Sequence, residues 1–240
     1  MSSQAAALRH MLLMVASALG EELRSKMAFV GGATTGLLVT DEFTREQVRA
    51  TDDVDLIVHA ISYVEFVDLQ CRLTERGFKY PSANLDDDIP ICAMYLKELR
   101  VDFMPKDENV LGFSNRWYED ALASATDYEL NDAITIRLVA PVYFLATKIE
   151  AFKGRGKGDY LVSRDIEDII ILLDGRPELL REVEAAPVDV RDYLAEELGI
   201  FLSEERFEDA INSHVRGDSE RVSIIFDRLY LLAGMVQPNS

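Results

Sequence analysis

The segment from Asp53 to Val58 constrains the fold more than any other stretch of the chain. Its sequence, Asp-Val-Asp-Leu-Ile-Val, puts two acids two positions apart at the start of an apolar run typical of a buried strand. Side chains alternate between the faces of a strand, so the two acids should lie side by side on one face while Val54 and Leu56 lie on the other. We therefore expect a core strand that carries neighbouring carboxylates.

The pair Asp53 and Asp55 has two interpretations. Carboxylates this close repel each other unless a positive charge lies between them, and a divalent cation held by carboxylate oxygens is a common solution. The alternative is a solvated acidic loop that leads into a strand, because a short Asp-x-Asp motif is weakly specific. The choice depends on which other side chains the fold brings to the same face.

Composition narrows the classes of function. The 240 residues are enough for a well-packed core, in one domain or two joined lobes. With 43 acidic and 25 basic side chains the net charge is -18, so a nucleic acid could bind only at a locally basic surface. No apolar stretch reaches the roughly 18 to 20 residues of a membrane span. We expect the two cysteines, Cys71 and Cys92, to be buried thiols of a cytoplasmic protein.

Two glycines precede the acidic strand. An amphipathic helix over residues 4–24 and a short strand, Met27–Val30, lead into Gly31-Gly32-Ala-Thr34-Thr35, which is typical of a strand-to-helix turn. Glycine lets backbone amides approach an anion, and a following helix directs its N-terminus to the same place. A plain tight turn is the alternative. The polar stretch 40–52 is expected to be a loop or a short exposed helix.

A third acid follows in a predicted hairpin. After a helix over residues 63–76, the segments 91–96 and 99–104 are expected to be strands joined at Lys97-Glu98. The second strand carries Asp102 in an apolar context, and such a carboxylate should face solvent or a cation. If this hairpin pairs beside the strand of Asp53, three carboxylates share one face of a sheet. A further helix over 117–124 and a strand over 133–139 are also expected.

The pattern becomes helical from Pro141, which is suited to the first position of a helix. The segment 148–164 contains five bases, and it is a hint of a polyanion-binding surface or, alternatively, a flexible solvated loop. The bases are Lys148, Lys153, Arg155, Lys157 and Arg164. Ser163 is expected to cap the next helix, with Asp165 and Asp168 away from its apolar face, either in an ion-pair cluster with Arg164 or in solvent. Three more helices are expected after residue 178.

The order of these features resembles the nucleotidyltransferase superfamily with the polymerase-beta-like fold. In that family a Gly-Gly or Gly-Ser turn is followed by a strand with Asp-x-Asp and by a third aspartate on a later strand. Within it, the chain looks most like the AbiEii-type nucleotidyltransferases, which are often toxins of bacterial toxin-antitoxin systems. This likeness is carried by Arg49-x-Thr51-x-Asp53-x-Asp55, by Lys148 followed by Arg155, and by the Ser-Arg-Asp-Ile-Glu-Asp segment that ends at Asp168. It covers residues 27 to about 172.

The resemblance implies an α+β fold. A nucleotidyltransferase core with a mixed sheet and flanking helices would occupy residues 1–139, and a helical lobe would occupy residues 140–240. Asp53, Asp55 and Asp102 would hold Mg²⁺ or Mn²⁺ and carry the chemistry. A nucleoside triphosphate would contact the turn, the edge of the acidic strand and the second lobe. The residues concerned are Gly31, Gly32, Thr34, Thr35, Arg49, Thr51, Lys148 and Arg155.

The leading hypothesis is transfer of a nucleoside monophosphate to a hydroxyl. The family likeness makes RNA, such as a transfer RNA end docked at residues 148–164, the first acceptor to consider. A small molecule or a protein hydroxyl is the alternative acceptor. A catalytically silent relative that binds a nucleotide or a partner protein is the competing hypothesis, and a protein antitoxin is a further partner to consider.

Overall fold

The computed structural model describes residues 3–82, 90–155 and 158–235, and the chain forms two compact units. The first unit consists of Met1–Thr34 and Arg49–Ala140, and the second of Thr35–Val48 and Pro141–Ser240. The second unit therefore includes a segment from within the N-terminal half, whereas the sequence interpretation divided the chain once, between residues 139 and 140. The α+β class, with a mixed sheet, flanking helices and a C-terminal helical region, is confirmed.

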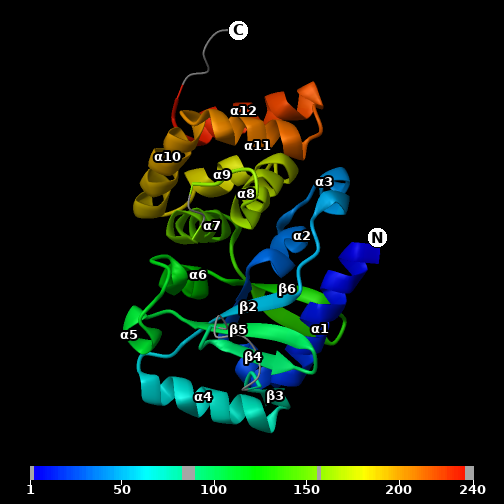
Figure 1. Cartoon of the computed structure of the whole chain (residues 1–240), viewed down its shortest axis with the longest axis vertical. Coiled ribbons are helices and arrows are strands. Elements are labelled where there is room, and N and C mark those ends of the chain that lie inside the picture. The colour runs from blue at the N-terminus through cyan, green and yellow to red at the C-terminus, as the bar shows by residue number, and fades with distance from the viewer. Residues whose placement is uncertain (1–2, 83–89, 156–157, 236–240) are drawn as a thin grey trace. The chain divides into compact units, whose positions relative to one another are not determined.

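The first unit contains a seven-stranded sheet in the order β3-β4-β5-β2-β1-β7-β6. Figure 1 labels β2, β3, β4, β5 and β6 of this sheet. Strand β2 pairs with β1 in antiparallel and with β5 in parallel orientation, so the sheet is mixed as predicted. The strands are β1 (Met27–Val30), β2 (Asp53–Val58), β3 (Phe78–Lys79), β4 (Ala93–Leu96), β5 (Leu99–Pro105), β6 (Thr126–Asn131) and β7 (Ile134–Leu138).

The core of this unit lies around the central strands. All four residues of β1 are buried, and in β2 the side chains of Val54 and Leu56 are fully covered while the two acids are partly exposed. The expected hairpin forms between β4 and β5, with Lys97 at φ 58° in the turn. The polar sequence of residues 84–90 predicts a turn, and residues 84–89 of it lie outside the described residues. Strand β6 was not predicted because its side chains are mostly polar and exposed.

Helices of the first unit flank the sheet. They are α1 (Ser3–Arg24), the short 3-10 helix η1 (Gly32–Thr34), α4 (Tyr63–Glu75), α5 (Glu108–Leu111) and α6 (Tyr118–Ala123). Helix α1 packs against strands that include β1, β2, β6 and β7, and it buries Leu12, Val15 and Leu19. Ser62 caps α4 by accepting a hydrogen bond from the amide of Glu65 at 3.2 Å, which fixes the start of that helix. The predictions for α4 and α6 are confirmed to within a residue or two. The ends of α1 also agree with the prediction, but the helix is kinked at Gly20, which has φ 66°.

The second unit is helical. It contains α2 (Thr35–Leu38), α3 (Glu42–Gln47), α7 (Pro141–Arg155), α8 (Arg164–Gly175), α9 (Leu179–Glu184), α10 (Val188–Leu202), α11 (Glu205–His214) and α12 (Ser219–Leu232). Helix α8 contacts α2, α3, α7, α11 and α12, and Ser163 caps it as expected. Four helices follow residue 178 in the part of the chain that the structure describes, one more than predicted.

Two further observations concern the apolar character of the helices and the burial of the two cysteines. Among the helices of the described ranges, none combines the length and the apolar character needed to cross a membrane. Cys92 is buried as expected, but Cys71 is exposed on α4, because the buried side of that helix is formed by Phe66, Gln70 and Leu73.

Candidate metal centre

Three aspartates from two neighbouring strands converge on one face of the sheet. The parallel register of β2 and β5 pairs Asp53 with Arg100 and Asp55 with Asp102. Each aspartate offers one carboxylate oxygen, and these three oxygens all lie within 4.8 Å of one another. Asp53 and Asp55 are partly exposed, whereas Asp102 is buried. The predicted alternation and the predicted third acid are both confirmed, and we call Asp53, Asp55 and Asp102 the triad.

A guanidinium lies among these carboxylates. Arg100 donates from Nε to Asp102 Oδ1 at 3.0 Å and from Nη2 to Asp102 Oδ2 at 2.7 Å. The same Nη2 is 3.3 Å from Asp53 Oδ2. The hydrogen bonds that Arg100 donates to Asp102 raise the pKa of Arg100, and the charges of Asp102, Asp53 and Asp55 act in the same direction. Arg100, a side chain of the same sheet, thus supplies a positive charge that reduces the repulsion among the neighbouring aspartates.

Arg100 was not recognised from the sequence. The signal was its position two residues before Asp102, which places both side chains on the same face of β5. This spacing alone does not identify Arg100 as part of the site. The β2–β5 register is also needed, because it puts Arg100 directly opposite Asp53.

The Gly31-Gly32 turn lies against the triad. Gly31 follows β1 directly and has φ 73°, a left-handed conformation that favours glycine. A Cβ atom at this position would lie 1.8 Å from Asp55 Oδ2, far inside any permitted contact. Gly31 is therefore required both by the backbone and by the carboxylate that packs against it. Gly32 starts η1, so the expected strand-to-helix turn is present.

Two threonines and an arginine lie around the same strand ends. Thr51 Oγ1 donates to Asp53 Oδ1 at 2.5 Å and orients that carboxylate. Thr34 is fully buried, and its hydroxyl donates to the carbonyl of Gly31 at 2.8 Å, so it stabilises the turn. Arg49 donates from Nη1 to the neighbouring carbonyl of Ala50 at 3.3 Å. The structure gives Thr34 an internal role, and it brings Thr51 directly to the triad.

Thr35 and Lys148 belong to the second unit, where they meet two buried acids. Lys148 Nζ lies 3.1 Å from Asp165 Oδ1 and 2.6 Å from Asp168 Oδ2. Thr35 Oγ1 donates to Asp168 Oδ1 at 3.2 Å. We call Lys148, Asp165 and Asp168 the buried cluster. The expectation that the two acids lie away from the buried face of α8 is wrong, because Lys148 of α7 supplies the counter-charge that allows their burial.

The remaining bases of the segment 148–164 do not form one surface in the described residues. Lys153 pairs with Glu150 and Glu197, and Arg164 is exposed at the start of α8. The side chain of Arg155 and all of Lys157 lie outside the described residues. Of the five bases, the structure therefore describes two in internal ion pairs and one exposed.

Cys92 lies on the chain next to β4 and is influenced by the same charges. Burial raises the pKa of its thiol to about 12, and the negative charge of Asp102 adds to the effect. At neutral pH the thiol is therefore protonated, which makes it a poor nucleophile.

The triad suits a divalent metal ion. Its donors are carboxylate oxygens alone, which hard cations such as Mg²⁺ and Mn²⁺ prefer over nitrogen and sulfur donors. Its strands are held rigidly in the sheet, and the side chains of Asp53 and Arg100 are 21% and 36% exposed, so the site is open to solvent. The cationic guanidinium of Arg100 already contacts two of the three carboxylates. The three aspartates could therefore hold a metal ion.

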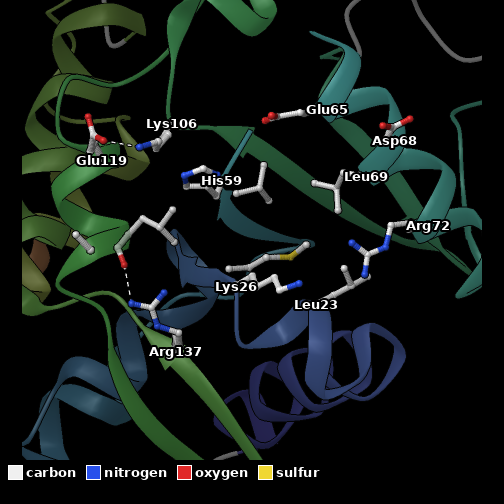
Figure 2. Close-up of a pocket in the computed structure, with 14 residues that line it drawn as sticks. Leu23, Lys26, His59, Glu65, Asp68, Leu69, Arg72, Lys106, Glu119 and Arg137 are labelled. Atoms are coloured by element: carbon white, nitrogen blue, oxygen red, sulfur yellow. Dashed lines mark hydrogen bonds and ion pairs between the residues drawn. The ribbon is translucent and has the colours of Figure 1, made fainter. Parts of the chain in front are cut away.

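A cavity of about 630 Å³ lies at the other end of these strands (Figure 2). Its apolar lining includes Leu23, Met27 and Val58. Met27 and Val58 form the pair at one end of the β1–β2 ladder, and Val30 and Asp55 form the pair at the other end, beside the triad. Several charged groups at its edge have internal partners: Lys106 pairs with Glu119, and Arg137 donates to the carbonyl of Leu122 at 2.7 Å (Figure 2). The cavity does not include the triad.

Comparisons with known proteins give no family for the chain. No protein-family model matches it. No curated protein sequence matches it either.

Proposed function

We propose that this protein is a metal-dependent nucleotidyltransferase. It moves a nucleoside monophosphate from a nucleoside triphosphate to a hydroxyl acceptor and releases pyrophosphate. The observation that carries the proposal is the convergence of three carboxylate oxygens within 4.8 Å of one another on β2 and β5. The contact of Gly31 with Asp55 supports it, because a glycine turn beside a carboxylate cluster brings backbone amides close to a metal-bound anion.

The triad would hold Mg²⁺ or Mn²⁺ through Asp53, Asp55 and Asp102. Such an ion, when bound, supplies Lewis-acid stabilisation of the negative charge that develops on the phosphate oxygens. Thr51 keeps the Asp53 carboxylate in its orientation through their hydrogen bond. Because Gly31 has no side chain, the Asp55 carboxylate can pack directly against its backbone.

The chemical step balances as a substitution at phosphorus. The acceptor oxygen forms a bond to the α-phosphorus, and the bond from that phosphorus to the oxygen bridging to the β-phosphate breaks. The proton of the acceptor hydroxyl passes to a carboxylate, for which Asp102 is the candidate, and then to solvent. The amides of the Gly31-Gly32 turn are candidates to contact the triphosphate.

The nature of the acceptor is proposed from the family likeness. RNA, including a transfer RNA end, is the first acceptor to test, and a small molecule or a protein hydroxyl is the second. The internal ion pairs of Lys148 and Lys153 weaken the proposal that RNA docks at residues 148–164, because paired bases attract phosphate less strongly. The toxin role and a protein antitoxin partner remain proposals from the same likeness.

A second candidate function is favoured by Arg100. Three acids would repel one another in a protein with no use for a metal, but Arg100 neutralises part of that charge. A catalytically silent relative that binds a nucleotide or a partner protein could therefore keep the triad.

The test is a transfer assay with α-labelled nucleoside triphosphates. The protein is incubated with Mg²⁺ or Mn²⁺ and, in separate reactions, with total RNA, with a mixed protein extract, and with small hydroxylated compounds such as aminoglycosides. We expect label in one acceptor class for the natural protein and none for an Asp53→Asn, Asp55→Asn double variant. The matched control is Asp52→Asn, since Asp52 is exposed and outside the alternation of the triad.

Two results would overturn the proposal. Undiminished transfer by the double variant would remove the triad from the chemistry. Triphosphate binding that is independent of divalent cations, together with no transfer to any acceptor, would support the silent relative instead.

A further inference from the structure

Four side chains form a rectangle on the face of two neighbouring strands. Asp53 lies opposite Arg100, and Asp55 lies opposite Asp102, across the parallel β2–β5 pair. Three corners are acids and the fourth is an arginine. The arginine contacts one neighbour along its own strand, Asp102, and one across the ladder, Asp53.

The guanidinium of Arg100 contacts carboxylate oxygens of two residues that could hold a metal ion, Asp53 and Asp102. It binds both carboxylate oxygens of Asp102 and reaches Oδ2 of Asp53, so it contacts two of the three residues of the triad. A carboxylate oxygen that accepts a hydrogen bond from a guanidinium has less electron density to offer to a cation. In addition, two positive charges a few ångströms apart repel each other.

The side chain of Arg100 is partly exposed to solvent. Its side chain is 36% exposed, compared with 8% for Asp102, so its outer part borders solvent. A long flexible side chain at the edge of a site can change rotamer without moving the strand that carries it. The carboxylates of β2 and β5 would stay in place because the ladder between the two strands fixes them.

We propose that Arg100 is an internal counter-cation that competes with the metal ion for the triad and must swing away before the ion can bind. This inference rests on the proposed metal centre and adds a regulation of it. Arg100 keeps the acids from destabilising the sheet at low cation concentration, and it lowers the affinity of the site. It is a positioning residue and takes no part in the chemical step.

The test is a titration with Mn²⁺ alone, followed by the electron paramagnetic resonance signal of the free ion. The natural protein, Arg100→Gln and a matched control, Arg72→Gln, are compared after removal of metal with a chelator. Arg72 also belongs to the first unit and pairs with an acid, Glu22, at 2.6 Å, but it lies on α4. Its loss therefore removes the same charge and one ion pair without touching the triad.

We expect Arg100→Gln to bind Mn²⁺ about tenfold more tightly than the natural protein, the scale of losing one charge-assisted hydrogen-bonded pair. Arg72→Gln should leave the affinity unchanged. In chelator, Arg100→Gln should melt at a lower temperature than the natural protein, and saturating Mn²⁺ should raise its melting temperature by more. Arg100→Lys, which keeps the charge but not the fork, should bind with intermediate affinity and provides a reading if Arg100→Gln does not fold.

The outcomes separate this inference from the proposed function. Equal or weaker Mn²⁺ binding by Arg100→Gln, with binding by the natural protein, would overturn the competition and leave the metal centre standing, because an arginine that only supports the carboxylates weakens the site when removed. No saturable binding by either protein would overturn the metal centre itself. Mn²⁺ binding by Arg100→Gln but not by the natural protein would support the competition, because Arg100 would then exclude the ion entirely.

Discussion

The triad and the buried cluster each combine aspartates with one basic side chain, but they differ in their access to solvent. In the triad the basic partner is Arg100, with a side chain 36% exposed. In the buried cluster it is Lys148, with a side chain 9% exposed, and its partner Asp168 is fully covered. A charge at the surface can be exchanged for another, whereas a charge without access to water must keep its partner. We therefore interpret the first as a site and the second as a structural element.

The comparison explains why similar residue types have different roles in the two units. Lys148 was a candidate phosphate contact, yet it holds α7 to α8 through two carboxylates. Thr35, a candidate from the glycine turn, contributes a hydrogen bond to the same group. Asp53, by contrast, has partners in Thr51 and Arg100 and remains partly exposed.

Replacing the basic partner should have the largest effect in the buried cluster. Lys148→Met leaves two covered carboxylates without their counter-charge, so we expect a loss of about 3 to 5 kcal/mol in the free energy of unfolding. Arg100→Met should lose less than Lys148→Met, because it leaves one buried carboxylate, Asp102, in place of two, and the Arg100 side chain is 36% exposed. Urea unfolding in the presence of a chelator measures both values.

A combined variant serves as the control. Lys148→Met together with Asp165→Asn and Asp168→Asn removes all three charges and should recover part of the lost stability. Equal losses for Lys148→Met and Arg100→Met would contradict the distinction between the two regions.

The next largest effect is expected at the glycine turn. Gly31→Ala forces a side chain into a left-handed backbone and into the Asp55 carboxylate, so we expect a loss of more than about 2 kcal/mol and much weaker Mn²⁺ binding. Gly112→Ala is the matched control, since Gly112 has φ 79° but open space where a Cβ would lie. Gly112→Ala should lose only about 1 kcal/mol in the free energy of unfolding, and its Mn²⁺ affinity should be unchanged. Equal metal affinity in the two variants would show that Gly31 does not shape the site.

A smaller effect is expected for the hydroxyl beside the triad. Thr51→Val keeps the shape of the side chain but removes the hydrogen bond to Asp53, which should cost about 1 kcal/mol of stability. Because Asp53 then loses its orienting donor, Mn²⁺ binding should weaken severalfold. Thr135→Val, at an exposed position of β7, is the control. A Thr51→Val variant with natural Mn²⁺ affinity would remove Thr51 from the site.

The smallest expected effect concerns the two cysteines, which differ in burial. Burial raises the pKa of Cys92 to about 12, so below about pH 10 almost none of it is the reactive thiolate. Cys71 is exposed and should react with a thiol reagent such as dithionitrobenzoate at pH 8. One thiol should therefore react in the folded protein and two in denaturant. Rapid reaction of Cys92 in the folded protein would contradict its burial.

Local patterns were enough to predict most of the first unit. The alternation at Asp53 and Asp55, the turn at Gly31-Gly32 and the β4–β5 hairpin each depend on residues close in sequence, and all are present. The third acid required one long-range assumption, that the hairpin pairs beside β2. That assumption is confirmed by the parallel register, which brings Asp102 opposite Asp55.

Long-range partners account for the errors. Arg100 stood in the sequence as an ordinary strand residue, and only the β2–β5 register gives it a partner in Asp53. The acids of α8 were expected away from the core because a pattern on one helix does not reveal Lys148 on another. The grouping of residues 35–48 with the second unit likewise depends on contacts across the chain, such as Thr44 with Asp174 at 2.7 Å.

The most direct test of the central claim is a Mn²⁺ titration of three proteins: the natural chain, the Asp53→Asn, Asp55→Asn double variant, and Asp52→Asn. We predict saturable binding in the natural chain and in Asp52→Asn, and its loss in the double variant, because only that variant removes oxygens of the triad. Unchanged binding in the double variant would contradict the account, since the cation would then be held elsewhere.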